Sequence, residues 1–568
     1  MSTLDINSHT HQCGFSRTLM NRMIKFIPYL LAALTLNGSA IYGAQTETMQ
    51  MHGLVLVADE QALSHIRQDQ ITGLYVDKQV PLPSSLRALQ KQLAPLYLNQ
   101  PITRDNLLLI KNEILKYYSA HKLQMITVEI PEQEVTSGVV VFVITQAHLG
   151  KISYRGNEWY SKKRVEKKLG NLKRGEVLNE DNLLNAIGWL NQNPFHHTEA
   201  ILSPGAQKGT TNLEVVTQDR FPLRVYTGGD NTGVASTGRG RYYAGLNWGD
   251  AFFVDDLLNY QFTSNSTYNK FHSHSLNYLS FLPWKHLFML YGGYAEIHPK
   301  LPDFHHTGKE AQGSVRYKIP FKPLYTNFQH QLYAGFDYKY ITSALFFVDK
   351  LISPIPVTQK AVNVTQEMLG YSLEYTPRHH ALSFQMELFG SPFKWLPHQT
   401  NHDYSSFRHD AKPRYFYGTL ALGDVYTFSS KDSISALLRA QGSANTLIPS
   451  EQFSLGGYNT VRGYPESVFI SDNGICANLE LRARPLSLFS KTKNALTFLA
   501  FMDYGWGYNY HAFDGITKTA QLWGTGPGLR YTIGPYASVR VDYGFKLHSV
   551  RFGGSDLGMW HVSANISY

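Results

Sequence analysis

A short glycine-rich stretch near the end of the chain contains the side chain best suited to specific ionic chemistry. The stretch SLGGYNTVRGYPES, residues 454–467, holds three glycines, two tyrosines and one arginine, Arg462. A guanidinium group is a planar fork of N–H donors that binds a carboxylate through two parallel hydrogen bonds, which a lysine does not reproduce. Glu466 is the only carboxylate in the stretch, so we expect the partner of Arg462 to lie elsewhere in the chain.

A run about forty residues later supplies a carboxylate in a suitable position. In ALTFLAFMDYGWGY, residues 495–508, every even position is apolar or amphipathic, whereas the odd positions include Asp503. Successive side chains of a strand point to opposite faces, so an even face in lipid would turn Asp503 towards the interior of a barrel. A loop that folds back into that interior could pair Arg462 with Asp503.

Other kinds of chemistry find little support in the sequence. We find no nucleophile elbow, zinc-protease motif or phosphate-binding loop, so we expect no catalytic residue and no cofactor. The histidine clusters lie on different predicted turns without fixed spacing to carboxylates, so we expect no metal site. These clusters are His196–His197, His272 to His274, His305–His306 and His379–His380.

The net charge of +9 does not require a nucleic-acid partner. Several arginines fall on inward positions of predicted strands or near strand ends, where a polar lumen or contact with lipopolysaccharide explains them. They include Arg482, Arg484, Arg530 and Arg540. We therefore expect outer-membrane lipid and lipopolysaccharide as contacts, and no nucleic acid.

The composition and the N-terminus favour an exported membrane barrel. The 568 residues are 43% hydrophobic but only 17% charged, with 36 Tyr, 31 Phe and 45 Gly. Basic residues precede the apolar run FIPYLLAALTL, residues 26–36, and small residues follow it. The pattern predicts a signal peptide over residues 1–44, because the apolar run is too short to span a membrane. Cys13 would leave with this peptide, so Cys476 has no disulfide partner.

Helical and strand patterns alternate between residues 72 and 220. Residues 103–122 have a helical apolar face after an N-cap at Thr103, and two strand-like runs follow at 124–130 and 138–146. A second round has a strand at 150–156, helices at 161–170 and 179–193, and two closing strands. We predict two α+β modules, at residues 72–149 and 150–220, preceded by an N-terminal segment at 45–71.

After residue 220 the helical period disappears and short alternating runs are separated by turn residues. A soluble sandwich would show the same alternation with its apolar face inward, so alternation alone leaves both folds open. The export signal, the terminal aromatic residue and the number of runs favour a membrane barrel over residues 221–568. These 348 residues, at roughly 22 per strand and connection, predict about 16 antiparallel strands.

Several motifs in order make the chain resemble the translocators of two-partner secretion, of the haemolysin secretion/activation type. Val461-Arg462-Gly463-Tyr464 resembles the VRGY tetrad of barrels coupled to POTRA domains, and residues 501–505, FMDYG, are similar to their F-x-D-x-G strand motif. Residues 130–144 resemble the signature of the family's first POTRA domain, and residues 189–215 resemble its second. Residues 228–256 look like the family's first barrel segment.

The resemblance implies two periplasmic POTRA domains and a 16-stranded barrel in the outer membrane of a Gram-negative bacterium. Such a protein would move one large secreted partner protein across that membrane without ATP, after the POTRA domains capture it unfolded. The resemblance assigns a loop latch inside the lumen to Val461, Arg462, Gly463, Tyr464, Phe501, Asp503 and Gly505. It assigns the first-POTRA signature, and through it cargo binding, to Pro131, Gln133 and Gly138.

Two further expectations concern the ends of the chain. In related proteins a terminal aromatic strand is recognised by the barrel-assembly machinery, so Tyr568 is a predicted assembly signal, although an ordinary interfacial tyrosine fits equally well. Family members often carry a plug helix and a linker before the first POTRA domain. Residues 45–71 leave little room for both, so we do not expect a plug helix there.

Two other functions stay open on the sequence alone. An assembly factor that inserts other barrels would share the VRGY tetrad, but it typically carries three or five POTRA domains where only two fit here. A passive porin or adhesin, with N-terminal modules that bind something unrelated, would share only the barrel.

Overall fold

The computed structural model describes residues 49–568, except residues 60, 62–65, 67–69, 83–84, 121–125, 171, 208, 324–326, 348–354, 512–516 and 551–555. The predicted signal peptide lies outside the described residues. The chain forms two compact units. The first runs to Asp219 without residues 193–195, and the second contains those three residues and residues 220–568.

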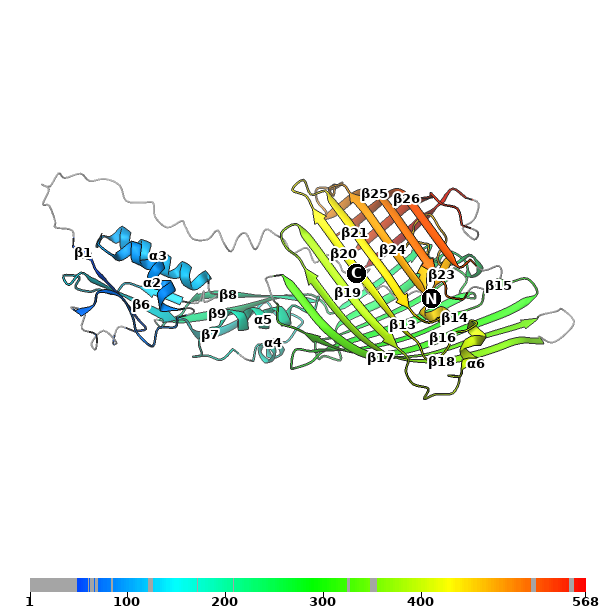
Figure 1. Ribbon diagram of the computed structural model, residues 1–568, viewed down its shortest axis with the longest axis horizontal. Coiled ribbons are helices and arrows are strands. Elements are labelled where there is room, and N and C mark those ends of the chain that lie inside the picture. Colours follow the sequence, from blue (N-terminus) through cyan, green and yellow to red (C-terminus); the bar gives the residue numbers. More distant parts are fainter. Residues whose placement is uncertain are drawn as a thin grey trace. The chain divides into compact units, whose positions relative to one another are not determined.

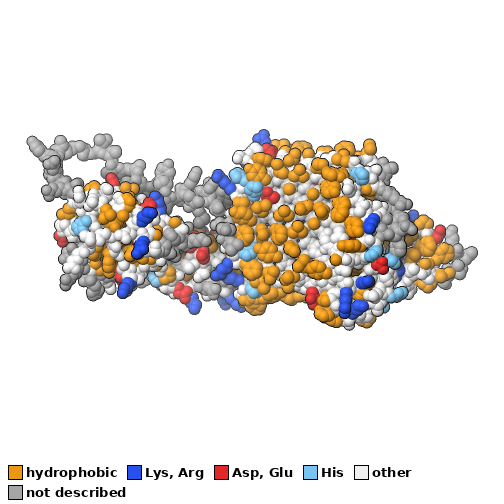
Figure 2. All heavy atoms as spheres, viewed as in Figure 1, with side chains coloured by type: hydrophobic (Ala, Val, Ile, Leu, Met, Phe, Trp, Pro, Cys, Tyr) orange, Lys and Arg blue, Asp and Glu red, His pale blue; other side chains and the backbone are white. Residues whose placement is uncertain are grey.

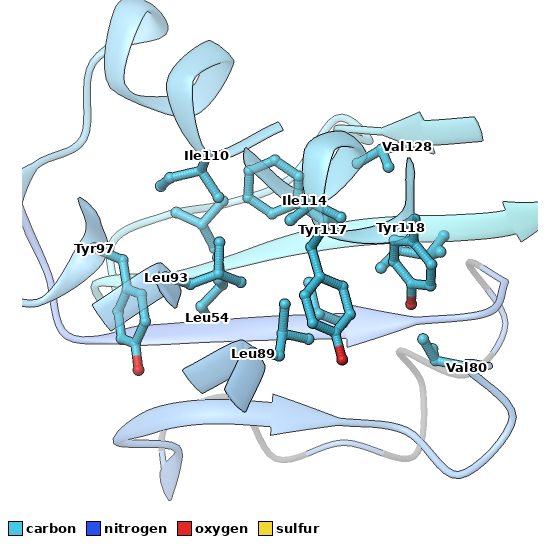
Figure 3. Packing of buried hydrophobic residues seen from close by; sticks show 14 of the residues in the cluster. Leu54, Val80, Leu89, Leu93, Tyr97, Ile110, Ile114, Tyr117, Tyr118 and Val128 are labelled. Carbon is cyan, nitrogen blue, oxygen red and sulfur yellow. The ribbon is translucent and has the colours of Figure 1, made fainter. Parts of the chain in front are cut away.

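The first module of the N-terminal unit packs two helices on a four-stranded sheet. The sheet order is β3 (Gly73–Val76), β2 (Gly53–Val57), β6 (Val139–Gln146) and β5 (Ile126–Glu129), and the helices are α2 (Leu86–Tyr97) and α3 (Arg104–Ala120). A separate two-stranded pairing joins β1 (Gln50–Met51) to β4 (Gln100–Pro101). Figure 3 shows apolar side chains of both helices, such as Leu93 and Ile114, packed against Leu54 of β2.

The predicted boundary at residue 72 needs correction. Strand β2 lies within residues 45–71, which the sequence analysis set apart, yet it pairs in parallel with both β3 and β6 at the centre of the sheet. Its run GLVLV is fully buried, as expected for a strand covered on both faces. A five-residue apolar run carries no alternation, so the pattern did not reveal it as a strand.

The second module has a three-stranded sheet in the order β7 (His148–Arg155), β9 (Thr210–Asp219) and β8 (His196–Pro204). Two helices, α4 (Lys162–Lys168) and α5 (Glu180–Leu190), lie where the sequence predicts them. The side chain of Asn179 caps α5 by accepting a hydrogen bond from the backbone N–H of Asn182 at 3.0 Å. Leu149, Leu183 and Leu213 belong to a buried core of this module.

The second unit is a closed antiparallel barrel of sixteen strands, which confirms the predicted fold class (Figure 1). The ring closes where β10 pairs with β28, with Tyr226 opposite Ser567. A two-residue strand, β15 (Lys300–Leu301), adds a small hairpin to β16. The sixteen strands are β10 (Leu223–Asp230), β11 (Arg241–Ala251), β12 (Asp256–Ser264), β13 (Phe271–Phe281), β14 (Leu287–Ile297), β16 (Phe304–Pro320), β17 (Phe328–Phe347), β18 (Ile355–Tyr375), β19 (His380–Gly390), β20 (Phe416–Thr427), β21 (Ser433–Ser443), β24 (Asn473–Arg482), β25 (Asn494–Tyr508), β26 (Thr519–Ile533), β27 (Ala537–Lys546) and β28 (Gly558–Ser567).

The outer face of the barrel is apolar and its inner face is polar. Figure 2 shows hydrophobic side chains covering the visible outer wall. On β25, Phe498 and Met502 are exposed outward, whereas Asp503 is fully buried on the opposite face. Outward apolar and inward polar side chains are what lipid outside and a wet interior require. Among the helices of the described residues, none is long and apolar enough to cross a membrane.

Connections at the two ends of the barrel differ in length. We call the end that carries the start of β10 and the C-terminus the short-turn end, since its connections include the three residues 534–536. At the opposite, long-loop end, residues 391–415 join β19 to β20 and contain α6 (Asn401–Phe407). There too, residues 444–472 join β21 to β24 and contain η5 (Pro449–Glu451), β22 (Phe453–Leu455) and β23 (Phe469–Ser471). We call residues 444–472 the inward loop.

Candidate functional site

The inward loop folds back into the barrel. Its strands β22 and β23 pair with each other and lie against β24 and β25 of the wall. Between them, residues 456–468 form a turn whose tip is held against the inner face, with Arg462 only 2% exposed. Two consecutive glycines at positive φ, Gly456 and Gly457, allow the chain to leave β22 at a steep angle.

The structure brings Arg462 and Asp503 together in a two-pronged ion pair. Arg462 Nε donates to Asp503 Oδ2 at 2.7 Å, and Nη2 donates to Oδ1 at 2.8 Å. The backbone N–H of Arg462 donates to the same carboxylate at 3.1 Å. The ring of Phe501, two residues before Asp503 on the same face, lies 3.5 Å from the guanidinium carbon. The guanidinium group of Arg462 therefore binds the Asp503 carboxylate with its edge and stacks on the Phe501 ring with its face. Both contacts need the planar group of an arginine.

Sequence reasoning missed two further carboxylates around Arg462. Its Nη1 donates to Glu480 of β24 at 2.6 Å and lies 3.4 Å from Asp542 of β27. Three arginines for which the sequence suggested a polar lumen or contact with lipopolysaccharide bind these two carboxylates: Arg482, Arg530 and Arg540. The cluster thus joins four arginines to three carboxylates. The alternation that singled out Asp503 also places Glu480 and Asp542 inward, and it could have identified both.

Glycines on the wall let the loop backbone approach closely. A Cβ atom at Gly524 would lie 2.0 Å from the carbonyl oxygen of Arg462, and one at Gly544 would lie 2.3 Å from the nitrogen of Gly463. Gly463 has φ +96°, where a side chain would be strained. At Gly505 a Cβ would lie 2.8 Å from a methyl group of Val461. The glycine residues of both motifs therefore serve the same contact, between loop and wall.

The remaining residues of the tetrad are also buried. Val461 and Tyr464 join Leu455, Cys476 and Leu522 in a small apolar cluster. The Tyr464 hydroxyl donates to the backbone carbonyl groups of Trp523 and His548. These contacts fix the loop on both sides of Arg462, so all seven predicted latch residues lie at a single interface.

The first-POTRA signature residues have local structural contacts. The Gln133 side chain accepts from the N–H of Val141 at 2.7 Å and donates to its carbonyl oxygen at 2.9 Å, so the amide imitates a neighbouring strand beside β6. Its Nε2 also donates to the carbonyl oxygen of Pro131. Gly138 has φ +68°, and a Cβ there would lie 2.4 Å from the ring of His52. Their positions support a role in building the module; direct cargo contact remains a prediction.

Replacing Gln133 by leucine is expected to loosen the first part of β6, which β5 does not reach, because the N–H and carbonyl groups of Val141 would lose their partners. Each unmet backbone group costs about 1–3 kcal/mol when it is buried. Hydrogen exchange of the full-length protein should show faster exchange at the Val141 amide, with the barrel strands unchanged. Thr136→Ala, at an exposed position of the same connection, is the control. Unchanged protection of Val141 in Gln133→Leu would contradict this structural role.

Tyr568 lies at the seam between the first and last barrel strands. Its backbone N–H donates to Val225 at 2.9 Å and its carbonyl oxygen accepts from Val225 at 3.1 Å, whereas its side chain is 90% exposed. An exposed terminal ring at the short-turn end is available to another protein. Its role as an assembly signal remains a prediction.

The histidine clusters were considered as possible metal ligands. Within the described ranges, no group of three or more His, Cys, Asp or Glu side chains is arranged to hold a metal ion. Cys476 is a buried free thiol in the apolar cluster beside Val461.

Comparison with known proteins points to one family. Residues 209–531 match the family model described as haemolysin secretion/activation protein ShlB/FhaC/HecB. The outer membrane transporter CdiB of Dickeya dadantii is 23% identical over 457 residues, with 78% of this chain and 76% of that protein covered. The heme/hemopexin transporter protein HuxB of Haemophilus influenzae strain 86-028NP is 24% identical over 471 residues, with 78% and 77% covered.

Solved structures show a similar fold over nearly the whole chain. CdiB from Escherichia coli aligns with a TM-score of 0.72 at 17% identity and covers 93% of each chain. CdiB from Acinetobacter baumannii aligns with a TM-score of 0.60 at 15% identity, covering 97% of this chain and 96% of that one. The shared architecture therefore includes the N-terminal modules as well as the barrel.

Proposed function

The chain belongs to the haemolysin secretion/activation protein family ShlB/FhaC/HecB, and from this premise we propose that it exports one large partner protein across the outer membrane by two-partner secretion. It is an outer-membrane translocator with periplasmic POTRA domains, and its family is one of transporters rather than enzymes. The observation that carries the proposal is the inward loop, which Arg462 holds against the wall of a sixteen-stranded barrel; in the chain, two small modules precede this barrel.

In the proposed mechanism the POTRA domains capture the partner as an extended chain. Each sheet ends in edge strands, and the longest edge is β8, which pairs on one side only, with β9. The Asn191 side chain covers the backbone of Thr198 at the start of that edge, so the part from Ala200 to Pro204 is the section that an extended peptide would join. Main-chain pairing tolerates many sequences, which suits an unfolded cargo.

Passage through the barrel needs no ATP in this mechanism. The sequence contains no phosphate-binding loop, and the two N-terminal modules precede the barrel in the chain. Entry of the cargo would displace the inward loop from part of the interior, and folding of the cargo outside the cell would draw the chain forward. The same proposal includes lipid and lipopolysaccharide around the outer wall, and barrel-assembly machinery that recognises the terminal strand at Tyr568.

Quantitative proteomics of the medium and surface fraction after depletion of this protein tests the proposal, with outer-membrane barrels measured in the same cells. We expect the loss of one large exoprotein while the barrels stay constant. A general fall in barrels would instead support an assembly factor, which the count of two modules already disfavours. No change in either fraction would overturn export and favour a passive porin or adhesin.

A further inference from the structure

We propose that Lys339 and Glu451 position the inward loop from a second side of the barrel, so that the loop spans the interior between two separate attachments. The Arg462 cluster is the first attachment, and we call the contacts of Glu451 the second attachment. The inference deepens the proposed export function and rests on it for its meaning in transport, but the test below needs no cargo.

Glu451 is buried in contacts with the barrel wall. It lies at the end of η5 and is 4% exposed. Its Oε1 accepts from Lys339 Nζ at 2.6 Å, and its Oε2 accepts from the Tyr417 hydroxyl at 2.9 Å. The backbone carbonyl oxygen of Glu451 accepts from Gln441 Nε2 at 2.9 Å. An ion pair at this depth is desolvated, so removal of either partner leaves an uncompensated charge.

The second attachment extends around the wall as far as β17, since Gln441 belongs to β21, Tyr417 to β20 and Lys339 to β17. Lys339 belongs to β17, and Asp503 belongs to β25. In the strand order β17, β18, β19, β20, β21, β24 and β25 they are six strands apart in a ring of sixteen. On β17 the flanking Tyr338 and Tyr340 are outward and 37% exposed, so Lys339 points inward. A loop that contacts β17 through Lys339 and β25 through Asp503 occupies the interior beside the strands between them, where it would obstruct a chain in transit.

The second attachment is also coupled to the connection that carries α6. Leu447 and Ile448, just before η5, pack in one buried cluster with Tyr404 of α6. Arg408, which follows α6, binds Asp472 at the end of the inward loop, and its Nη2 also donates to Asn509 at 2.8 Å. Residues 391–415 and the first half of the inward loop are therefore packed together at the long-loop end. We call these two segments together the cover.

The two attachments differ in strength. Arg462 contacts three carboxylates, stacks on Phe501, and lies between backbone contacts that glycines make possible. Glu451 has one cation, one hydroxyl partner on the wall and a glutamine at its backbone. We infer that the Glu451 end releases first, together with the cover, while the Arg462 end stays bound.

The test uses the purified full-length protein in planar lipid bilayers, with Glu451→Gln, Lys339→Met and the double variant. Glu387→Gln is the matched control. Glu387 is another carboxylate of the inner wall, and it accepts hydrogen bonds from Tyr333, Gln385 and Thr419. Among the described residues it has no hydrogen bond or ion pair with the inward loop. Limited trypsin digestion of the same samples compares cleavage after Arg408, in the cover, with cleavage after Arg462, at the first attachment.

Each single variant is expected to raise both the time spent in the high-conductance state and the rate of cleavage after Arg408 by at least about tenfold. The double variant should add little, because both residues serve one contact. Arg462 should stay protected, since only the second attachment opens. Values like those of Glu387→Gln and the wild type would overturn the proposal. Equal exposure of Arg408 and Arg462 would also overturn it, because it would show general loosening of the barrel. Neither outcome depends on whether an exported partner exists.

Discussion

Replacement of Arg462 by alanine is expected to reduce secretion of the partner protein by at least about tenfold. Three carboxylates, from Glu480, Asp503 and Asp542, would lose a shared cation inside the barrel, and removal of one partner of a buried ion pair typically costs about 3–5 kcal/mol. The inward loop would then leave the wall. Secreted partner in the medium is the measurement, and heat-modifiable gel migration shows that the barrel still assembles.

Two companion variants make this expectation specific to the ion pair. Asp503→Ala should cause a similar loss, and the Arg462→Ala/Asp503→Ala double variant should lose little more, because both changes remove the same contact. If the loss in the double variant equals the sum of the two single losses, the proposed pairing is contradicted. Arg484→Ala, at an exposed arginine outside the cluster, is the matched control and should secrete normally.

Arginine geometry is tested separately by Arg462→Lys. A lysine keeps the charge but cannot bind Asp503 through two parallel bonds while also reaching Glu480 and stacking on Phe501. We expect secretion to stay close to the alanine level. Normal secretion by this variant would show that a positive charge alone is sufficient.

The second large effect is expected from Gly524→Ala on β26. The added methyl group would lie 2.0 Å from the carbonyl oxygen of Arg462, a backbone atom that cannot move aside by a change of rotamer. The loop must therefore separate from the wall although every ionic partner is still present. We expect a loss of secretion comparable to that of Arg462→Ala, together with trypsin cleavage after Arg462, which is only 2% exposed in the intact protein.

A matched glycine distinguishes this clash from a general effect on the strands. Gly442, on β21, has open space where a Cβ would stand, so Gly442→Ala should secrete normally and protect Arg462 from trypsin. If Gly524→Ala behaves like Gly442→Ala, close packing of loop and wall is not required for export.

The sequence by itself determined the fold class and, within the cluster around Arg462, the pairing of Arg462 with Asp503. Alternation of apolar and polar residues predicted the strands, and the export signal, the terminal aromatic residue and the number of runs favoured a membrane barrel over a sandwich. In such a barrel the alternation placed Asp503 inward, because lipid accepts only the apolar face of a strand. Helical periods and caps predicted α3, α4 and α5 for the same kind of reason. These signals are local, so they can be read along the chain.

Tertiary structure decided the features that depend on distant parts of the chain. The place of β2 at the centre of the first sheet was hidden, because a short buried run has no periodicity and its partner β6 lies far along the chain, with Gly53 opposite Val139. The partners of Arg462 on β24 and β27, and the Lys339–Glu451 contact 112 residues apart, depend on how a closed ring brings its inner faces together. Alternation states which way a side chain points; only the closed barrel decides which inward side chains meet.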